Sequence, residues 1–83
     1  MLTYKSLNMK KELVLNIDGK LYNSSYIKLG NKFIVDTHHQ DFKGILIDNF
    51  TFRVNHGKVS YLLIHSKTEE IGSQIVNQIL LSA

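Results

Sequence analysis

The last third of the chain, residues 49–83, restricts the fold most, because two unlike patterns follow one another there. Residues 50–63 alternate apolar and polar side chains around a central His56-Gly57 pair, which is the pattern of a β-hairpin with a two-residue turn. Gly57 suits the positive φ that such a turn requires. Residues 66–81 repeat apolar side chains every three or four positions, which predicts an amphipathic helix. The chain is therefore expected to end as a hairpin that leads into a helix.

The position of the turn also predicts which side chains of the hairpin share a face. Residues that lie opposite one another on neighbouring strands project to the same side of a sheet. One face is aromatic and aliphatic, with the predicted pairs Val54–Val59, Phe52–Tyr61 and Phe50–Leu63. The other face is mostly polar, with the predicted pairs Arg53–Ser60 and Thr51–Leu62. We expect the first face to meet the helix and the second to face outward.

The predicted helix has a start signal and one unusual residue. Ser66-Lys67-Thr68-Glu69 fits a capping box, in which the first and last side chains each bind the other residue's backbone amide. Gly72 weakens a helix by about 1 kcal/mol relative to Ala, so it either marks close packing on the sheet or is simply tolerated. The apolar stripe consists of Ile71, Ile75, Val76, Ile79 and Leu80, and the opposite, polar side of Ser73, Gln74, Asn77 and Gln78.

Upstream, short apolar runs alternate with turn residues. Asp18-Gly19 and Gly30-Asn31 predict two further hairpin turns. Asn23-Ser24-Ser25 is expected to interrupt a strand, and Asp36–Lys43 is expected to form the longest loop. The predicted strands cover residues 12–17, 20–22, 26–29, 32–35 and 45–47.

These elements predict one α+β, β-rich domain over residues 1–83: an antiparallel meander of five or six strands with one C-terminal amphipathic helix packed on the sheet. The pattern is compatible with an open sheet and with a closed barrel. The order hairpin then helix over residues 49–83 resembles the last part of a pleckstrin-homology-type domain, which implies architecture alone; the Trp frequent in that family's helix is absent. Residues 1–9 fit no single pattern, and Met9 is an alternative start.

Composition limits the classes of protein. The chain has no Cys, which excludes disulfides and thiolate metal sites. No apolar run reaches membrane-spanning length, and no secretion signal is recognisable, so we expect a cytoplasmic protein without membrane contact. Asn, Ile and Lys make up 25 of 83 residues, whereas Gly, Ala, Arg and Pro make up seven. That bias follows A/T-rich codons and predicts a phage, another mobile element or a low-GC bacterium as the source.

Charge and exposed side chains define two candidate surfaces. The chain carries a net charge of +3, and all ten Lys and Arg residues lie within residues 1–67, against five Asp and Glu there. This distribution permits nucleic-acid contact without establishing it. Cations interleaved with aromatic rings on a sheet are typical of single-strand binding, where bases stack on rings. The candidate nucleic-acid residues are Tyr26, Lys28, Lys32, Lys43, Arg53 and Lys58. The candidate protein-contact residues are Leu62 and Thr51.

The histidines give only weak evidence for a metal site or a catalytic site. His38 and His39 with Asp41 suggest a metal site, but adjacent residues of an extended chain point to opposite sides, and no spaced third ligand follows. Either histidine with Lys43 and a Tyr contains the groups of a small ribonuclease, though the spacing does not require it. We therefore predict no catalytic residue, metal or cofactor.

Three functional hypotheses remain. The first, which we favour, is a small non-enzymatic inhibitor or accessory protein that docks on a host protein or ribonucleoprotein. The second is an RNA- or DNA-binding β domain that uses a sheet face with lysines and aromatic rings. The third, a minor alternative, is a small ribonuclease. Exposed strand edges also permit self-association into an oligomer.

Overall fold

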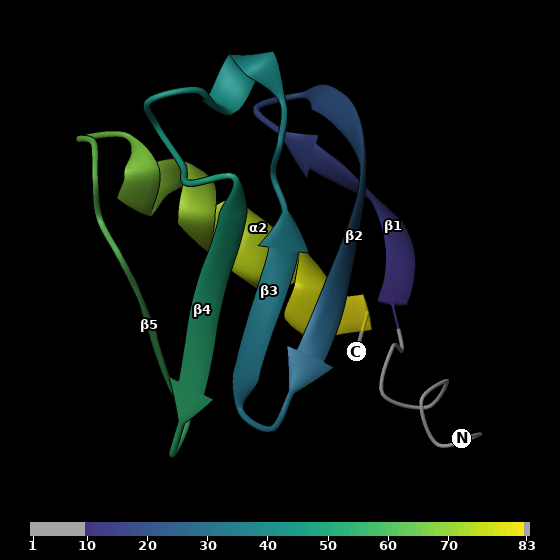
Figure 1. The fold of residues 1–83 in the computed structure, drawn as a ribbon, viewed down its shortest axis with the longest axis vertical. Coiled ribbons are helices and arrows are strands. Elements are labelled where there is room, and N and C mark those ends of the chain that lie inside the picture. The colour runs from purple at the N-terminus through teal and green to yellow at the C-terminus, as the bar shows by residue number, and fades with distance from the viewer. Residues whose placement is uncertain (1–9, 83) are drawn as a thin grey trace.

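The structure is a computed structural model that describes residues 10–82, so the interpretations of residues 1–9 lie outside it. It confirms the predicted architecture: a five-stranded antiparallel sheet with strand order β1-β2-β3-β4-β5, and one C-terminal helix packed on it (Figure 1). The strands are β1 (Lys10–Ile17), β2 (Lys20–Leu29), β3 (Lys32–Asp36), β4 (Asn49–Asn55) and β5 (Lys58–Tyr61), followed by helix α2 (Thr68–Ser82). Within residues 10–82, β1 and β5 do not pair with each other, so the sheet is open.

The register of the C-terminal hairpin is confirmed close to its turn. Phe52 pairs with Tyr61, Arg53 with Ser60 and Val54 with Val59. His56 and Gly57 both have positive φ, 52° and 78°, as a type I′ turn requires. The predicted pairs Phe50–Leu63 and Thr51–Leu62 are wrong, because β5 ends at Tyr61.

The chain leaves the sheet after Tyr61 because the start of the helix is fixed elsewhere. Thr68 is fully buried, and its hydroxyl donates to the carbonyl of Ile45. It also accepts from the amide of His65 at 3.0 Å, while Nδ1 of His65 accepts from the amide of Lys67 at 3.0 Å. The reciprocal cap therefore joins His65 to Thr68 and not Ser66 to Glu69, as the sequence suggested, and the helix begins two residues later than predicted.

The core lies between one face of the sheet and α2, which crosses behind the strands (Figure 1). Gly72 is needed for this close approach, because a Cβ there would lie 2.8 Å from Tyr61 Cε2 and 3.1 Å from Phe50 Cζ. Leu80 is the exception in the predicted stripe, since it is exposed near the end of the helix. The largest fully buried side chains are Phe50, Phe52, Leu15, Ile75, Ile79, Val35 and Thr68.

Two local predictions upstream are wrong. β2 runs without interruption through residues 23–25, because the Ser24 hydroxyl donates to the Asp36 carbonyl at 2.7 Å and the polar side chain fits into the sheet. Residues 45–47 form a turn and not a strand. They follow a 3-10 helix, η1 (Gln40–Phe42), and the amides of Ile45 and Leu46 both bind the carbonyl of Phe42. Phe42 and Leu46 are buried, so the polar loop contributes to the core.

Candidate binding surface

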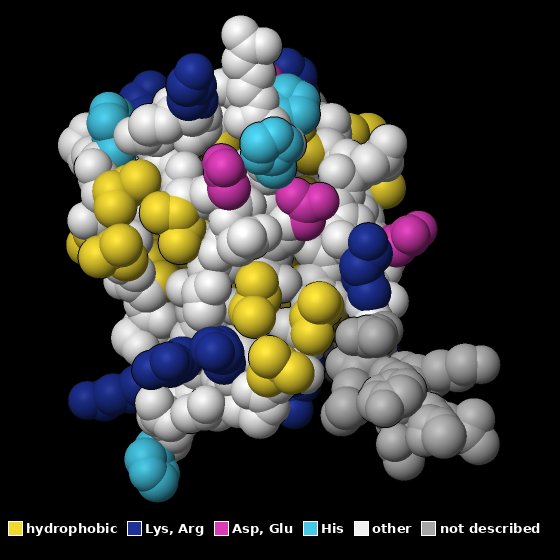
Figure 2. Space-filling view, viewed as in Figure 1, with side chains coloured by type: hydrophobic (Ala, Val, Ile, Leu, Met, Phe, Trp, Pro, Cys, Tyr) yellow, Lys and Arg dark blue, Asp and Glu magenta, His cyan; other side chains and the backbone are white. Residues whose placement is uncertain are grey.

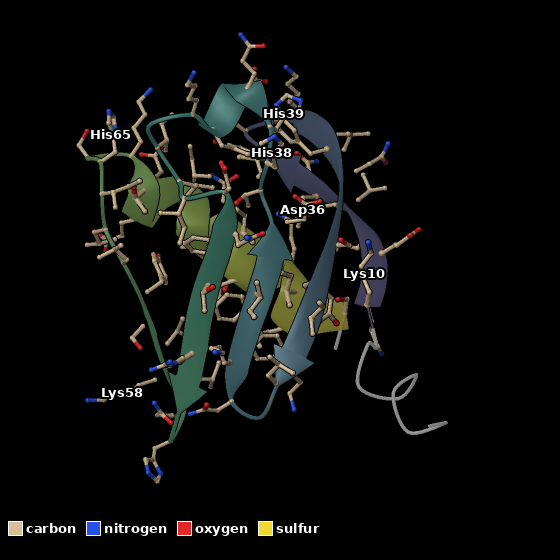
Figure 3. The ribbon with its side chains drawn as sticks, in the orientation of Figure 1. Lys10, Asp36, His38, His39, Lys58 and His65 are labelled. Atoms are coloured by element: carbon tan, nitrogen blue, oxygen red, sulfur yellow. The ribbon has the colours of Figure 1, made fainter. Side chains whose placement is uncertain are left out.

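Three cations form a row across the sheet face that points away from α2. Lys32 and Arg53 are direct cross-strand partners, and Lys58 lies on the next strand opposite Asn55. Within residues 10–82, none of the three forms an ion pair with an Asp or Glu. We call Lys32, Arg53 and Lys58 the basic row; the dark-blue side chains low on this face in Figure 2 include it, and Figure 3 labels Lys58 at its outer end. Like charges directly opposite one another destabilise a sheet. An anionic ligand would therefore reduce the repulsion between Lys32 and Arg53.

Beside the basic row, the sheet ends in an exposed apolar stretch. Leu62, Leu63 and Ile64 directly follow β5 and are 62%, 57% and 43% exposed. Val59 on β5 itself is 38% exposed. We call Leu62–Ile64 the edge segment. Contiguous exposed apolar surface is a feature of protein interaction sites.

A shallow groove of about 360 Å³ joins the two features. It is lined by Thr51, Arg53, Ser60, Tyr61 and Leu62. Arg53 supplies the charge, and Leu62 extends the groove to the edge segment. The structure thus brings together Thr51, Leu62 and Arg53, which the sequence had assigned to two different surfaces.

The remaining candidate nucleic-acid residues do not join the basic row. Tyr26 is only 4% exposed and packs in the core on the side of the helix, which corrects its assignment as a base-stacking residue. Lys28 shares that side of the sheet, with its amine 5.9 Å from the centre of the Phe33 ring. Lys43 follows η1 at the opposite end of the molecule. Since the outward faces of β1–β5 carry no Phe or Tyr, they offer no stacking platform.

The two histidines after β3 lie together at that opposite end (Figure 3). His38, His39 and Lys43 line one pocket of about 370 Å³ with Gln40 and Asp48. His39 is held in place: its Nδ1 accepts from the Asp41 amide at 3.1 Å. His38 Nδ1 lies 3.4 Å from an Asp48 carboxylate oxygen. Within the described residues, no three His, Asp or Glu side chains are placed to hold a metal ion.

The tyrosine nearest to this pocket is occupied in a structural contact. The Tyr22 hydroxyl donates to the Asp41 carboxylate at 3.0 Å, and the Lys20 amine contacts the same oxygen at 2.6 Å. The hydrogen bond from Lys20, and then that from Tyr22, lower the pKa of Asp41. Burial, followed by the hydrogen bond to Asp41, raises the pKa of Tyr22. The network ties η1 to the first hairpin, and it leaves Tyr22 poorly suited to proton transfer at neutral pH.

The residues that sequence reasoning missed lie at the other edge of the sheet. Gln78 donates to the Asn16 carbonyl and accepts from the Asn16 amide, both at 2.7 Å, so its side-chain amide replaces a neighbouring strand. Gln74 accepts from the Asp18 amide at 3.0 Å. Both glutamines had been assigned to the solvent side of the helix. Their spacing of four residues, beside the apolar stripe, is the only sequence signal of this role.

Comparison with known proteins adds no assignment: no protein family, no curated sequence and no solved structure matches this chain. Within residues 10–82, α2 is the one α-helix, and it is neither long nor apolar enough to cross a membrane.

Proposed function

We propose that the chain is a small non-enzymatic binding protein that docks on another protein, as an inhibitor or accessory factor, through the basic row and the edge segment. The observation that carries the proposal is their continuity: Arg53 of the basic row, which has no ion-pair partner within residues 10–82, and the exposed Leu62 of the edge segment line the same groove. The composition makes a phage or mobile element the expected source, and a host protein or ribonucleoprotein the expected target.

The chemistry of this surface favours a protein as its ligand. Buried apolar contacts supply much of the free energy of protein association, and Arg is enriched among the residues that matter most. Arg53 lies between Lys32 on one strand and the Leu62 side of the groove. An acidic partner surface with apolar residues beside it would satisfy both parts of this site. A ligand made only of phosphate would leave the edge segment exposed.

Site-specific photocrosslinking tests the proposal. A photoreactive phenylalanine analogue is placed at Leu62 and, as the matched control, at Val14, which is 55% exposed on β1 at the other edge. In nuclease-treated bacterial extract we expect a discrete protein adduct from position 62 and none from position 14. Arg53→Gln with Lys58→Gln should remove the adduct. Equal adducts at both positions, or an adduct that survives the charge changes, would contradict the proposal.

Nucleic-acid binding is the second candidate, because Lys32 and Arg53 lie opposite one another without an acidic neighbour in the described part of the chain. Three phosphate contacts to a single strand predict a slope of about −2 in log K against log salt concentration. Fluorescence anisotropy with labelled single-stranded RNA measures that slope. Lys32→Gln with Arg53→Gln should flatten it. Salt-independent or absent binding would remove this candidate.

A further inference from the structure

The two edge strands, β1 and β5, each belong to a hairpin with a two-residue turn, but their outward backbone groups have different partners. In a two-residue hairpin, the residues that flank the turn exchange both of their backbone hydrogen bonds, and the next residue directs its amide and carbonyl away from its partner strand. Asn16 is that next residue in β1, and its amide and carbonyl do point outward, to Gln78. Val59 is the corresponding residue in β5.

The outward backbone amides and carbonyls of β5 therefore have the arrangement that pairing with one more strand requires. By the same alternation, Val59 and Tyr61 both direct their amides and carbonyls to the outer side of β5. Within residues 10–82, β5 pairs with β4 alone, and no backbone or side-chain group bonds the amides of Val59 and Tyr61 from the outer side. An extended peptide that adds itself to such an edge gains main-chain hydrogen bonds, and its alternate side chains determine specificity.

The side chains beside this edge differ between the two faces of the sheet. On the outward face lie Lys58 and Ser60 of β5, with Arg53 of β4 directly opposite Ser60. On the helix-facing side lie Val59 and Tyr61, and Leu63 follows beyond the strand. The two faces of an added strand would therefore meet positive charge and apolar surface respectively.

This asymmetry also indicates which strand fits. Lysine on an edge strand discourages pairing with an identical edge, since a second copy would bring a second basic row to the interface. The same lysine attracts a strand with acidic side chains. Charge complementarity thus favours a partner protein over self-association.

We propose that the β5 edge binds an extended segment of a partner protein in which acidic and apolar side chains alternate. The acidic side chains would lie beside Lys58 and Ser60, with Arg53 across Ser60 on β4, and the apolar ones beside Val59 and Tyr61. This inference rests on the proposed function and specifies how the docking occurs: by strand addition to β5, and not by contact between side-chain surfaces alone.

The first experiment uses a ten-residue peptide of alternating Glu and Val, with a peptide of five Glu followed by five Val as the composition control. NMR of the whole chain should show slower amide exchange at Val59 and Tyr61 when the alternating peptide is added. Exchange at Asn16, which already has its partner in Gln78, should not change. Absence of binding, or equal binding of both peptides, would overturn the inference.

Variants separate backbone pairing from charge. Val59→Pro removes one outward amide of β5, and Val14→Pro removes an outward amide of β1, two residues before Asn16. We expect Val59→Pro to weaken peptide binding about ten-fold and Val14→Pro to leave it unchanged. Because either proline can disturb folding, the charge reversal Arg53→Glu with Lys58→Glu gives an independent test: it should exclude the Glu-Val peptide and admit a Lys-Val peptide.

The outcomes distinguish this inference from the broader proposal. If the peptide fails while the crosslink at Leu62 persists, the chain docks through side chains, and strand addition is wrong. If both fail, the proposed function fails with it. A concentration-dependent dimer that Val59→Pro abolishes would show that the edge takes a second copy of this chain, which would also overturn the inference.

Discussion

The β1 edge and the β5 edge of the sheet differ in whether the helix binds their outward backbone groups. Every open sheet has two strands with unpaired backbone groups, and natural proteins usually cover or blunt them. At β1, two glutamines of α2 bind the backbone of Asn16 and Asp18. At β5 the helix packs on the face of the strand through Gly72 and Tyr61, but in the described residues no helix side chain bonds the outer edge, and the chain continues into Leu62–Ile64 with its apolar side chains exposed. The chain's own helix covers the β1 edge and leaves the β5 edge uncovered. The outward backbone groups of β5 are therefore the ones available to a partner.

The crossing direction of α2 produces this difference. Its first turn is fixed by Thr68 near Ile45, beyond the end of β5, and its later turns reach β1 (Figure 1). The helix can therefore donate polar side chains only to the β1 side. Gly72 and Tyr61 form the contact that holds the β5 side against the helix.

The largest expected effect tests that contact. Gly72→Val places a branched side chain where even a Cβ lies 2.8 Å from the Tyr61 ring. Overpacking should lower the free energy of unfolding by about 2–3 kcal/mol, since the added atoms meet the rings of Tyr61 and of Phe50, and Phe50 is fully buried in the core. Urea denaturation measures the change. Ser73→Val is the matched control on the exposed side of the helix and should change stability by about 0.5 kcal/mol or less.

A smaller loss is expected at the sealed edge. Gln78→Ala removes both hydrogen bonds to Asn16 and should cost about 1–2 kcal/mol, because the freed groups can reach water only in part. Amide exchange at Asn16 should accelerate while exchange at Val59 stays unchanged. Asn77→Ala, one residue away on the exposed side, serves as the control. If exchange at Asn16 did not accelerate, the glutamine would not be sealing the edge.

Stability is expected to depend on pH beside the β1–β2 hairpin, where Asp41 binds two side chains of β2. Hydrogen bonds from Lys20 and Tyr22 lower the pKa of Asp41 in the folded state. A lowered pKa means that the carboxylate stabilises the fold above its ordinary pKa of about 3.9 and loses this contribution as the pH falls through its folded value. Asp41→Asn should therefore unfold at a lower temperature than the natural chain at neutral pH.

The gap in melting temperature between the two should close in acid, below about pH 4. Asp48→Asn removes a carboxylate whose only ion-pair contact in the described residues is His38, and it provides the control for a general change in net charge. An Asp41→Asn gap that stayed constant with pH would show that the loss comes from shape and not from ionisation.

The sequence predicts those features of the fold and of the candidate site that depend on residues close together in the chain, and misses those that depend on residues far apart in it. The hairpin turns and their registers follow from local chemistry, as the pair Val54–Val59 shows. The end of β5 could not be predicted, because it depends on a hydrogen bond between Thr68 and Ile45, 23 residues apart. For the same reason Gln78 was taken as a solvent residue: its partner, Asn16, is 62 residues away. Within the candidate site, alternation placed Arg53 correctly on the outward face, but it could not show that Tyr26 is buried.

The smallest change in stability is expected at the open edge, and it is the sharpest test of the comparison. Leu62→Ser with Leu63→Ser removes two side chains that are mostly exposed, so the free energy of unfolding should change by about 0.5 kcal/mol or less. Leu15→Ser in β1, which is fully buried, should by contrast destabilise the fold severely. If the two leucines stabilised the fold as core residues do, the edge segment would belong to the core. For the binding readout the photoreactive residue is moved from Leu62 to Val59. If the double variant folds normally but loses the protein adduct that position 59 gives in the natural chain, the exposed leucines serve binding rather than folding.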